Sequence, residues 1–445
     1  MKRKVILVPG NTDLNRGDQA LVWESINIIK DVYDDPEVIL MKGDDHRQYA
    51  QTEKLGYQMI NAILKHPARI FSKRQHIRYS VLDIILIGLV AVFDLIGSSL
   101  LLVHCRWINQ FALFFMSDAS KEAFNAFRTC DAVYVKGGGF IHSYGAVTDA
   151  YQMYYLLYYI LLAIRHKKDV FVLPNSIGPL KNKLAGWLAD YVMNHCSFLS
   201  VRESVSGKFL ADRKSIKVPV FRHADLGFFL TSDDTFDYDA YLRAHGVNTS
   251  KPIIGITLRP YRFPGDPEPE KKYELYINSF VSLSQHLSER NYQIVLFSHT
   301  LGPSAHENDT FAVKDVSALL EQKGVKHVCI EDFDLDCRKV MAIYSRFTFL
   351  IGTRFHSVIF AQNSLVPTVA IAYGGNKGVG IMKDSGLPEY SIPMDAITGS
   401  KLVDIFDKLD KEREQVIDKL RLNRILINKD RSMMIKELKE MVTGG

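Results

Sequence analysis

Short apolar runs that end in glycine, proline, asparagine or aspartate recur along the 445-residue chain. Such runs are typical of buried strands. Longer stretches with helical spacing lie between most of them, and strands that alternate with helices predict parallel sheets. The predicted class is therefore α/β, with strands at Val5–Val8, Val38–Met41, Ala132–Val135, Val170–Leu173, Phe198–Val201, Ile253–Thr257, Gln293–Phe297, His327–Ile330, Phe347–Ile351 and Thr368–Ile371.

The strand pattern is interrupted near the middle of the chain. Residues Thr231–Pro252 carry turn-forming side chains around one short helical stretch, Tyr238–His245. About five strands fall on either side, which predicts two Rossmann-like lobes with a central cleft. We place the first lobe at 1–245, the second at 246–400, and C-terminal helices, indicated by the spacing of Leu, Ile and Val, at 401–445.

One segment departs from this pattern. Residues Val81–Val103 are apolar apart from two Asp and two Ser, and a second apolar patch follows at Phe111–Met116. The length meets the roughly 20 residues that a membrane span needs. However, Asp94 would then lie near the bilayer centre, at a cost of about 2.5–3.5 kcal/mol. The preceding segment carries the cations that attract anionic headgroups, namely Lys65, Arg69, Lys73, Arg74 and Arg78.

We therefore interpret residues 81–116 as an apolar helical insertion in the first lobe that contacts a membrane as a monotopic element or hairpin. Burial in the protein core or against a partner subunit is the alternative interpretation. A complete span is the less favoured form of membrane contact.

Composition and charge narrow the class of protein. Apolar residues make up 47% of the chain and charged residues 24%, which excludes wholesale disorder. A net charge of +5 is too diffuse for a duplex-binding protein, so nucleic acid is not an expected partner. Five cysteines without a CxxC pair argue against a zinc site, and no secretory signal is expected before Val5–Val8. We expect a cytoplasmic protein, attached to the inner face of the membrane if the insertion binds lipid.

Glycine-rich and polar segments follow several predicted strands, at the edge where parallel sheets bind ligands. Asn15-Arg16-Gly17-Asp18 opens a predicted helix, and a helix N-terminus attracts anions; a plain tight turn is the alternative. A strand tip further on carries Ser176. Three successive glycines either form an anion-binding nest or permit close helix packing; they are Gly137, Gly138 and Gly139.

Cationic side chains end strands in both predicted lobes. Each has an ordinary explanation when taken singly, since Arg202 could pair with Glu203 and a lone histidine is more often structural. Arg354 and His356 lie two residues apart at a predicted helix N-terminus, which forms a ready phosphate site. Several such cations in succession favour one anion-binding cleft. Its candidate residues are Arg202, Arg259, His299, Arg354, His356 and Lys377.

In this order and spacing, the segments resemble the polysaccharide pyruvyl transferase family. The chain departs from the family pattern at Asn175, where Gln is usual, at Leu226, where Pro is commoner, and in the insertion at 81–116. The resemblance rests on Asn11–Ala20, Gly137–Gly139, Asn175–Pro179, Arg202-Glu203, Asp225, His299 with Gly302-Pro303, Thr353–Ser357, and Lys377-Gly378.

The resemblance implies a GT-B-like fold and an enzyme that uses phosphoenolpyruvate to place a pyruvyl ketal on sugar hydroxyls of a surface or capsular polysaccharide. Carried over by motif, Arg202, Arg354, His356 and Lys377 bind the donor. We expect His356 to act as the acid or as a phosphate ligand. Asp18 is the candidate base that takes protons from the sugar.

These residue types suit that chemistry. Phosphoenolpyruvate carries a carboxylate and a phosphate on three carbons, so its site must offer several cations close together. Because Arg and Lys neutralise the phosphate, we expect neither a metal ion nor another cofactor. The expected acceptor is a saccharide, and it is lipid-linked if the insertion anchors the protein to a membrane.

Two other functions remain open at this point. A nucleotide-sugar glycosyltransferase of the same architecture would be expected to hold ribose hydroxyls with a second-lobe carboxylate, and no acid follows His356 before Asp384. A non-catalytic scaffold could instead use the insertion to recruit glycan-assembly enzymes to a membrane. Only the scaffold would tolerate loss of Arg354 and His356 without loss of activity.

Overall fold

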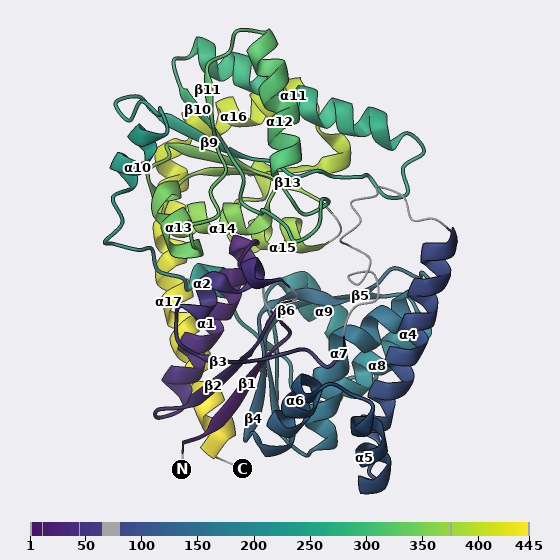
Figure 1. Cartoon of the computed structure of the whole chain (residues 1–445). Helices are drawn as coiled ribbons and strands as arrows, with labels where there is room; N and C mark the ends of the chain where they lie inside the picture. Colours follow the sequence, from purple (N-terminus) through teal and green to yellow (C-terminus); the bar gives the residue numbers. More distant parts are fainter. Residues whose placement is uncertain (1, 11, 44, 65–80, 374–375, 444–445) are drawn as a thin grey trace.

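The computed structural model describes residues 2–10, 12–43, 45–64, 81–373 and 376–443, without the side chains at 81, 83, 84 and 376–379. The predicted basic flank at 65–80 and the side chain of Lys377 therefore lie outside the described residues. The described chain forms two α/β lobes, one above the other in Figure 1, each built around a parallel sheet. The α/β class with two Rossmann-like lobes is confirmed.

The first-lobe sheet is built from buried apolar strands, and in β1 every residue after Lys4 is buried. All pairings between its described strands are parallel. The strand order is β3 (Gln58–Ile60), β2 (Glu37–Met41), β1 (Lys4–Val8), β4 (Ala132–Val135), β6 (Asp169–Leu180), β7 (Phe198–Val201) and β8 (Phe221–Arg222), with β5 (Gly138–Ser143) paired to β6.

The second-lobe sheet follows the same plan and is also parallel throughout its described pairings. Chain order reverses between β9 and β12, which places a topological switch point at the carboxyl ends of these central strands. The strand order is β11 (His327–Ile330), β10 (Gln293–Phe297), β9 (Ile253–Thr257), β12 (Phe349–Gly352), β13 (Thr368–Ala372) and β14 (Ser391–Pro393).

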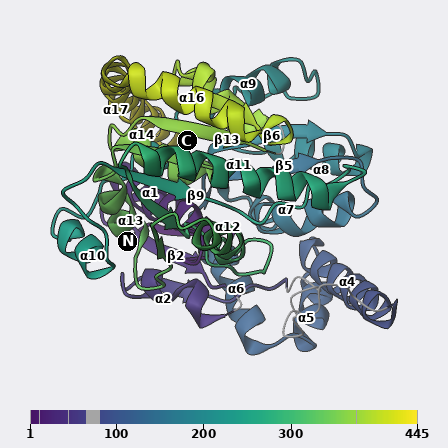
Figure 2. The same ribbon diagram turned by 90° about the horizontal axis from the view of Figure 1, so that it is seen from above.

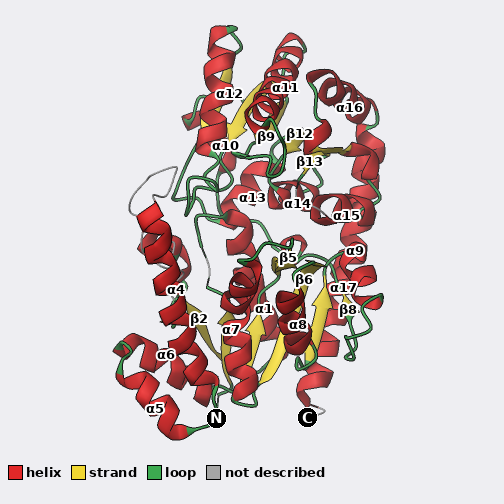
Figure 3. Ribbon diagram, turned by 90° about the vertical axis from the view of Figure 1, so that its right-hand side faces the viewer, coloured by secondary structure: helices red, strands yellow, loops and turns green. Residues whose placement is uncertain are grey.

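Helices cover the sheets, as Figure 3 shows by secondary structure and Figure 2 from above. The first lobe contains α1 (Arg16–Val32), α2 (Ala50–Glu53), α4 (Val81–Leu102), α5 (Arg106–Phe114), α6 (Asp118–Thr129), α7 (Asp149–Arg165), α8 (Lys183–Met193) and α9 (Ser204–Ala211). The second lobe and the tail contain α10 (Tyr238–Ala244), α11 (Pro269–Glu289), α12 (Thr310–Gln322), α13 (Cys337–Ser345), α14 (Phe355–Asn363), α15 (Asn376–Asp384), α16 (Gly399–Lys411) and α17 (Arg413–Thr443).

Each of the ten predicted strands corresponds to an observed strand, and the strands that prediction missed are short. β3, β8 and β14 have two or three residues, too few to form an apolar run. β5 begins at Gly138, where a loop was predicted. Gly138 and Gly139 are therefore the first residues of a strand, and only Gly137 lies in the connection before it, instead of all three forming an open anion-binding loop.

The packing of α10 does not follow the lobe boundary that the sequence predicts. The helix α10 lies before residue 245, our predicted end of the first lobe, yet Leu242 belongs to the hydrophobic core of the second lobe and α10 packs against α13. By packing, the second lobe therefore begins earlier in the chain than the turn-rich segment indicated.

The C-terminal helices are present, and α17 connects the two lobes (Figure 1). Its first half contributes Val416 and Leu420 to the second-lobe core. Its second half returns to the first lobe, where it packs against α1 and where Met434 and Leu438 are fully buried in the core cluster that also contains β1 and β2 residues. The long tail helix thus holds the lobes together along one side of the molecule.

The predicted apolar insertion folds as the helices α4 and α5 on the outside of the first lobe (Figure 1). Within α4, Ile85–Leu102 is long and apolar enough to cross a membrane by length and composition, with a mean hydropathy of 2.4. Only 11% of that stretch is buried in the structure. Burial in the protein's own core is therefore not its role.

Candidate active site

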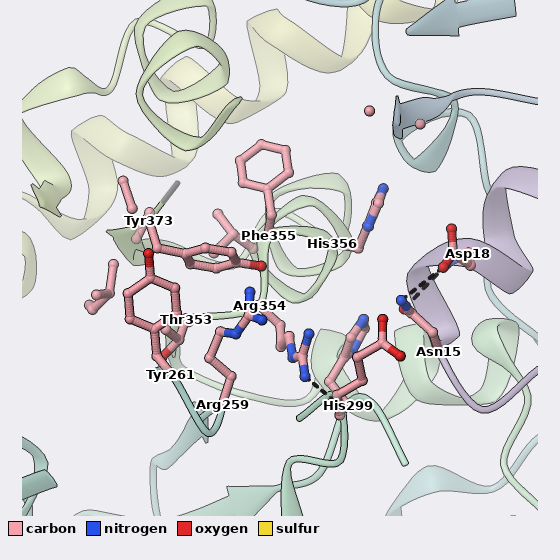
Figure 4. Close-up of a pocket in the computed structure, with 18 of the residues that line it drawn as sticks. Asn15, Asp18, Arg259, Tyr261, His299, Thr353, Arg354, Phe355, His356 and Tyr373 are labelled. Carbon is pink, nitrogen blue, oxygen red and sulfur yellow. Dashed lines mark hydrogen bonds between the residues drawn. The ribbon is translucent and has the colours of Figure 1, made fainter. Parts of the chain in front are cut away.

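A cavity of about 490 Å³ lies between the lobes, at the carboxyl ends of the central strands. It is lined from the first lobe by α1, β5 and Arg202, and from the second by residues that follow β9, β10, β12 and β13. Figure 4 shows Arg259, Tyr261 and Tyr373 at one end and His356 with Asp18 at the other. The predicted site residues that line this cavity are Asn15, Asp18, Gly138, Gly139, Arg202, Arg259, His299, Arg354 and His356.

Two predicted residues lie behind the cavity wall. Ser176 is buried; its hydroxyl accepts a hydrogen bond from Nε of Arg202 at 2.7 Å and donates one to Glu203 at 3.0 Å. Ser176 therefore positions Arg202 instead of contacting a ligand. Gly137 is needed for close packing, because a β-carbon there would lie 3.1 Å from Leu226 and from the Pro174 carbonyl oxygen. Lys377 falls in the first turn of α15, and its side chain lies outside the description.

A buried carboxylate links the lobes at the centre of the site. Asp225 accepts a hydrogen bond from Nη1 of Arg202 at 2.5 Å and another from the Gly227 N–H at 2.8 Å. Its other near neighbour comes from the second lobe, where Nε2 of His356 lies 3.6 Å from Oδ1. Burial raises the pKa of Asp225, but the charges of Arg202 and His356 outweigh burial and hold it well below its usual range. Asp225 is therefore an ionised anchor for both side chains.

The His356 ring is held in a narrow slot between the lobes. A β-carbon on Gly17, in the first turn of α1, would collide with the ring. On another side, a β-carbon on Gly227 would lie 3.4 Å from its Cδ2. The two glycines thus allow a second-lobe histidine to lie against first-lobe backbone. Gly17 was part of the predicted polar cluster, but this contact depends on tertiary structure.

Arg354 is held by a second carboxylate. Its Nε donates to Asp309 at 2.7 Å and its Nη2 donates to the Glu307 carbonyl at 2.6 Å, while the Thr300 N–H bonds the other Asp309 oxygen. Burial lowers the pKa of Arg354, but the charge of Asp309 raises it further, so the guanidinium stays charged. In the described part of the chain, Nη1 of Arg354 has no hydrogen-bond partner and is available to a ligand.

His299 is a neutral member of the cavity wall. Burial, followed by the charges of His356 and Arg354, lowers its pKa well below the ordinary value. Its Nδ1 lies 3.1 Å from the Tyr344 hydroxyl, and its buried Nε2 has no partner among the described residues. It can therefore exchange one hydrogen bond with a ligand without adding charge.

Arg259 has an environment unlike those of the other two arginines. Among the residues that the structure describes, it forms no ion pair, and its buried Nε has no hydrogen-bond partner. Its guanidinium carbon lies 4.0 Å from the centre of the Tyr373 ring and 5.5 Å from that of Tyr261, so cation–π contacts hold it. No described acid forms an ion pair with Arg259, and Asp309, whose pKa its charge helps to lower, is already paired with Arg354, so the Arg259 charge is available to an anionic ligand.

Asp18 lies on the first-lobe side of the cavity. It accepts hydrogen bonds from Nζ of Lys136 at 3.1 Å and from Nδ2 of Asn15 at 2.9 Å. Asn15 also caps α1 by accepting from the N–H groups of Gly17 and Asp18, which explains why this polar cluster opens a helix. Burial raises the pKa of Asp18, but Lys136 and then His356 and Arg202 lower it further, so the carboxylate is ionised.

Comparison with known proteins agrees with this geometry. The family model described as polysaccharide pyruvyl transferase matches residues 15–375. The chain belongs to the polysaccharide pyruvyl transferase family. The amylovoran biosynthesis protein AmsJ of Erwinia amylovora is 27% identical over 348 residues, which cover 76% of this chain and 80% of AmsJ.

Solved structures show the fold of this pyruvyl transferase family member. The putative UDP-N-acetylglucosamine 2-epimerase of Listeria monocytogenes is 11% identical, with a TM-score of 0.59 over 100% of this chain and 98% of the other. HepE of Anabaena, in complex with UDP and glucose, is 10% identical, with a TM-score of 0.56 over the whole of both chains. The likeness confirms a GT-B-like architecture and, at this identity, concerns the fold alone.

Some site residues of this family member had only an indirect sequence signal. Tyr261 and Tyr373 each follow a strand, as the predicted cations do, but an aromatic residue near a strand end is usually part of a core. The pairing of Arg202 with Asp225 and of Arg354 with Asp309 joins residues 23 and 45 positions apart. Among the described residues, no three His, Cys, Asp or Glu side chains gather as a metal site requires.

Proposed function

We propose that this protein transfers the pyruvyl group of phosphoenolpyruvate to two hydroxyls of a saccharide, forming a ketal during synthesis of an extracellular polysaccharide. The observation that carries this proposal is the convergence of Arg202, Arg259, Arg354 and His356, from both lobes, on one cavity. Family membership and the similarity to an amylovoran biosynthesis protein support it.

Each of the three arginines has its own part in binding the donor. Arg202 and Arg354 are oriented by buried acids, and each keeps one terminal nitrogen for a phosphate or carboxylate oxygen. Arg259 adds the charge that no described acid neutralises. A guanidinium fixed by its neighbours binds a planar carboxylate or a phosphate in two directed hydrogen bonds. We include Lys377 as a further donor ligand from the neighbouring α15.

His356 is the proposed proton donor. It gives a proton to the methylene carbon of phosphoenolpyruvate, while Asp225 holds the ring and stabilises its cationic form. A sugar hydroxyl adds to the resulting cationic carbon, the carbon–oxygen bond to phosphate breaks, and a second hydroxyl closes the ketal. The methylene carbon becomes a methyl group with the proton from His356. One of the two hydroxyl protons returns to His356, and the other leaves with the phosphate.

Asp18 is proposed to accept a hydrogen bond from a sugar hydroxyl and to relay its proton as that hydroxyl adds, since its carboxylate faces the same cavity from the opposite lobe. Because its pKa lies below the usual range, it orients a hydroxyl better than it removes a proton from one. An Asp18→Asn variant should therefore lose acceptor affinity as well as turnover.

The reaction as proposed needs no metal ion or other cofactor, because guanidinium groups stabilise the departing phosphate. Enzyme treated with a chelator and assayed without divalent cations should keep its rate of phosphate release from phosphoenolpyruvate. Loss of that rate, restored by one added metal, would contradict this part of the proposal.

The test is release of phosphate from phosphoenolpyruvate in the presence of saccharide acceptors, with mass detection of a pyruvylated product. Arg259→Gln should lower kcat/KM about 10- to 150-fold, which corresponds to the loss of a charge-assisted hydrogen bond of about 1.5–3 kcal/mol. Arg262→Gln, an exposed arginine three residues along that does not line the cavity, is the matched control.

Two results would overturn the proposal. Transfer of a sugar from a nucleotide sugar, with no phosphate release from phosphoenolpyruvate for any acceptor tried, would favour the glycosyltransferase alternative. Equal activity in the Arg259→Gln and Arg262→Gln variants would remove this cavity from the reaction.

A further inference from the structure

The outer surfaces of α4 and α5 form an apolar face that the described protein leaves uncovered. From Leu82 to Ile96, every exposed residue of α4 whose side chain the structure describes is apolar or glycine; Asp83 is not among those described. On α5 and just after it, four aromatic side chains are exposed, and Trp107 reaches 81% exposure. We call this surface the hairpin face; its large exposed residues are Leu82, Ile85, Leu86, Leu89, Val92, Phe93, Ile96, Trp107, Phe111, Phe114 and Phe115.

Several polar groups of the same helices face the protein, whereas Arg106 and Gln110 of α5 are exposed. Ser98 and Ser99 lie 2.9 and 3.2 Å from the Tyr154 hydroxyl on α7. Asn109 of α5 donates to the Leu100 carbonyl at 2.8 Å and accepts from Arg165 at the end of α7 at 2.7 Å. The two helices are therefore held against the first lobe along one side by these hydrogen bonds, and their mainly apolar opposite side is exposed.

The sole acidic side chain that the structure describes on α4 also faces the protein. Asp94 lies close enough to α7 that its charge, after the larger effect of burial, raises the pKa of Tyr151. A helix that crossed a bilayer would have to leave α7 and carry Asp94 into hydrocarbon. A helix that lies in the membrane–water interface, parallel to the bilayer, keeps its contacts with α7 and places only its outer side in the lipid.

The charge of the segment favours a lipid surface over another protein. Residues 65–116 contain six Lys or Arg and two Asp, and one of the cations, Arg106, is exposed at the start of α5. Cations beside an apolar face attract anionic headgroups while the apolar side chains enter the acyl boundary. A protein interface of this size would carry a polar rim, whereas the exposed surface of α4 from Leu82 to Ile96 has no polar side chain among the described residues.

We propose that the hairpin face docks this protein onto a bilayer that contains anionic lipid, as a monotopic element that does not span it. One consequence rests on the proposed function. The helix α7 contacts both α4 and β5; β5 contributes Gly138, Gly139 and His142 to the cavity, and Tyr144 follows it directly. Docking would therefore hold the cavity one helix away from the membrane, where a saccharide on a lipid carrier is the acceptor within reach.

The test is flotation of the full-length protein with preformed vesicles of phosphatidylcholine containing phosphatidylglycerol. The wild-type protein should float with them, less so with pure phosphatidylcholine or at high salt. A Leu89→Ser/Phe93→Ser variant should lower the bound fraction at least about tenfold. The matched control, Leu422→Ser/Met433→Ser, changes two exposed apolar residues of α17 and should float as the wild type does.

Tryptophan emission reports insertion directly, because Trp107 is the most exposed of the three tryptophans. Brominated lipids should quench the wild-type emission, and a Trp107→Phe variant should lose most of that quenching. Flotation of the hairpin variant at the wild-type level, or a hairpin-dependent dimer that does not float, would overturn the proposal. Flotation requires no turnover, so its result is independent of the proposed reaction.

Discussion

At the scale of single residues, the site depends on charges whose neighbours fix their state. Asp225 and Asp309 each neutralise one arginine and orient it, whereas Arg259 lies between two tyrosines without a described acid. This difference is why we propose different roles for three chemically identical side chains. The oriented pair defines geometry, and Arg259 supplies net charge.

The slot around His356 gives a prediction about geometry. Gly17→Ala should displace the ring and lower kcat by about tenfold or more with little change in the melting temperature, because misplaced catalytic groups lose far more rate than stability. Gly207→Ala is the control, since a β-carbon on this helical glycine meets only ordinary contact at 3.8 Å. Equal kcat in the two variants would show that the ring is free to shift.

The neutral state of His299 predicts a pH dependence of stability. In the unfolded chain a histidine binds a proton below about pH 6.5, but in the folded protein burial lowers the pKa of His299 well below that value. The unfolded state then binds more protons, so the free energy of unfolding should fall as the pH drops below 6.5. The slope from this residue is at most about 1.4 kcal/mol per pH unit.

Urea denaturation at pH 7.5, 6.0 and 5.0 measures this slope. His299→Gln should flatten it relative to the wild type, and the difference between the two proteins isolates His299 from Asp309, whose pKa burial raises to about 6. His166→Gln should flatten the slope as well, since burial lowers its pKa to about 4. An unchanged slope in His299→Gln would mean that His299 takes up its proton in the folded state.

At the scale of elements, α17 shows how one helix serves two lobes. Its second half buries Met434 and Leu438 in the first lobe, where Arg431 pairs with Glu24 at 2.8 Å. His223 of the first lobe lies between Asp430 and Glu437, 2.9 Å from each. The end of the chain is therefore a structural part of the first lobe and not an appended tail.

Leu438→Ala should lower the free energy of unfolding by about 2–5 kcal/mol, because it leaves a cavity in a closely packed core. Leu422→Ala, at a position of the same helix that is 58% exposed, should change it by less than about 0.5 kcal/mol. Urea midpoints measure both variants. A small loss in Leu438→Ala would mean that the contact with the first lobe is weak in solution.

At the scale of the whole molecule, the lobes are connected beside the cavity as well as along α17. The buried Arg16 donates to the Asp332 carbonyl at 3.0 Å, the Leu301 N–H donates to the Leu14 carbonyl at 2.7 Å, and the Cys337 N–H donates to Gln19 at 2.7 Å. The segment around the start of α1 therefore forms hydrogen bonds with both lobes, with Lys136 and Gln51 of the first and with Asp332 and Cys337 of the second. A ligand in the cavity contacts both lobes at once.

Binding of phosphoenolpyruvate should therefore raise the melting temperature of the whole protein. At a concentration 100 times the Kd the gain is about 2.7 kcal/mol, or a shift of several degrees. UDP should give little shift if the cavity is built for the smaller donor, and Arg259→Gln should reduce the shift from phosphoenolpyruvate. A larger shift with UDP would support a nucleotide-sugar donor instead.

The amino-acid sequence alone was enough to predict the α/β class, the ten principal strands, the family and most of the charged residues that line the cavity. These follow from local signals, because a buried parallel strand is a continuous apolar run and its carboxyl end is where polar side chains gather. It also located the apolar insertion, because hydropathy needs no knowledge of the fold.

Which charges neutralise one another, and which side of α4 faces solvent, became known only from the three-dimensional arrangement of the elements. The pairing of Arg202 with Asp225 and the fit of His356 against Gly17 join distant parts of the chain, and no local pattern encodes such contacts. The same holds for α17, whose spacing predicts a helix but not the lobe that it covers. Secondary structure follows from short stretches of sequence. Ion pairing and side-chain packing at the cavity depend on all the elements that come together there.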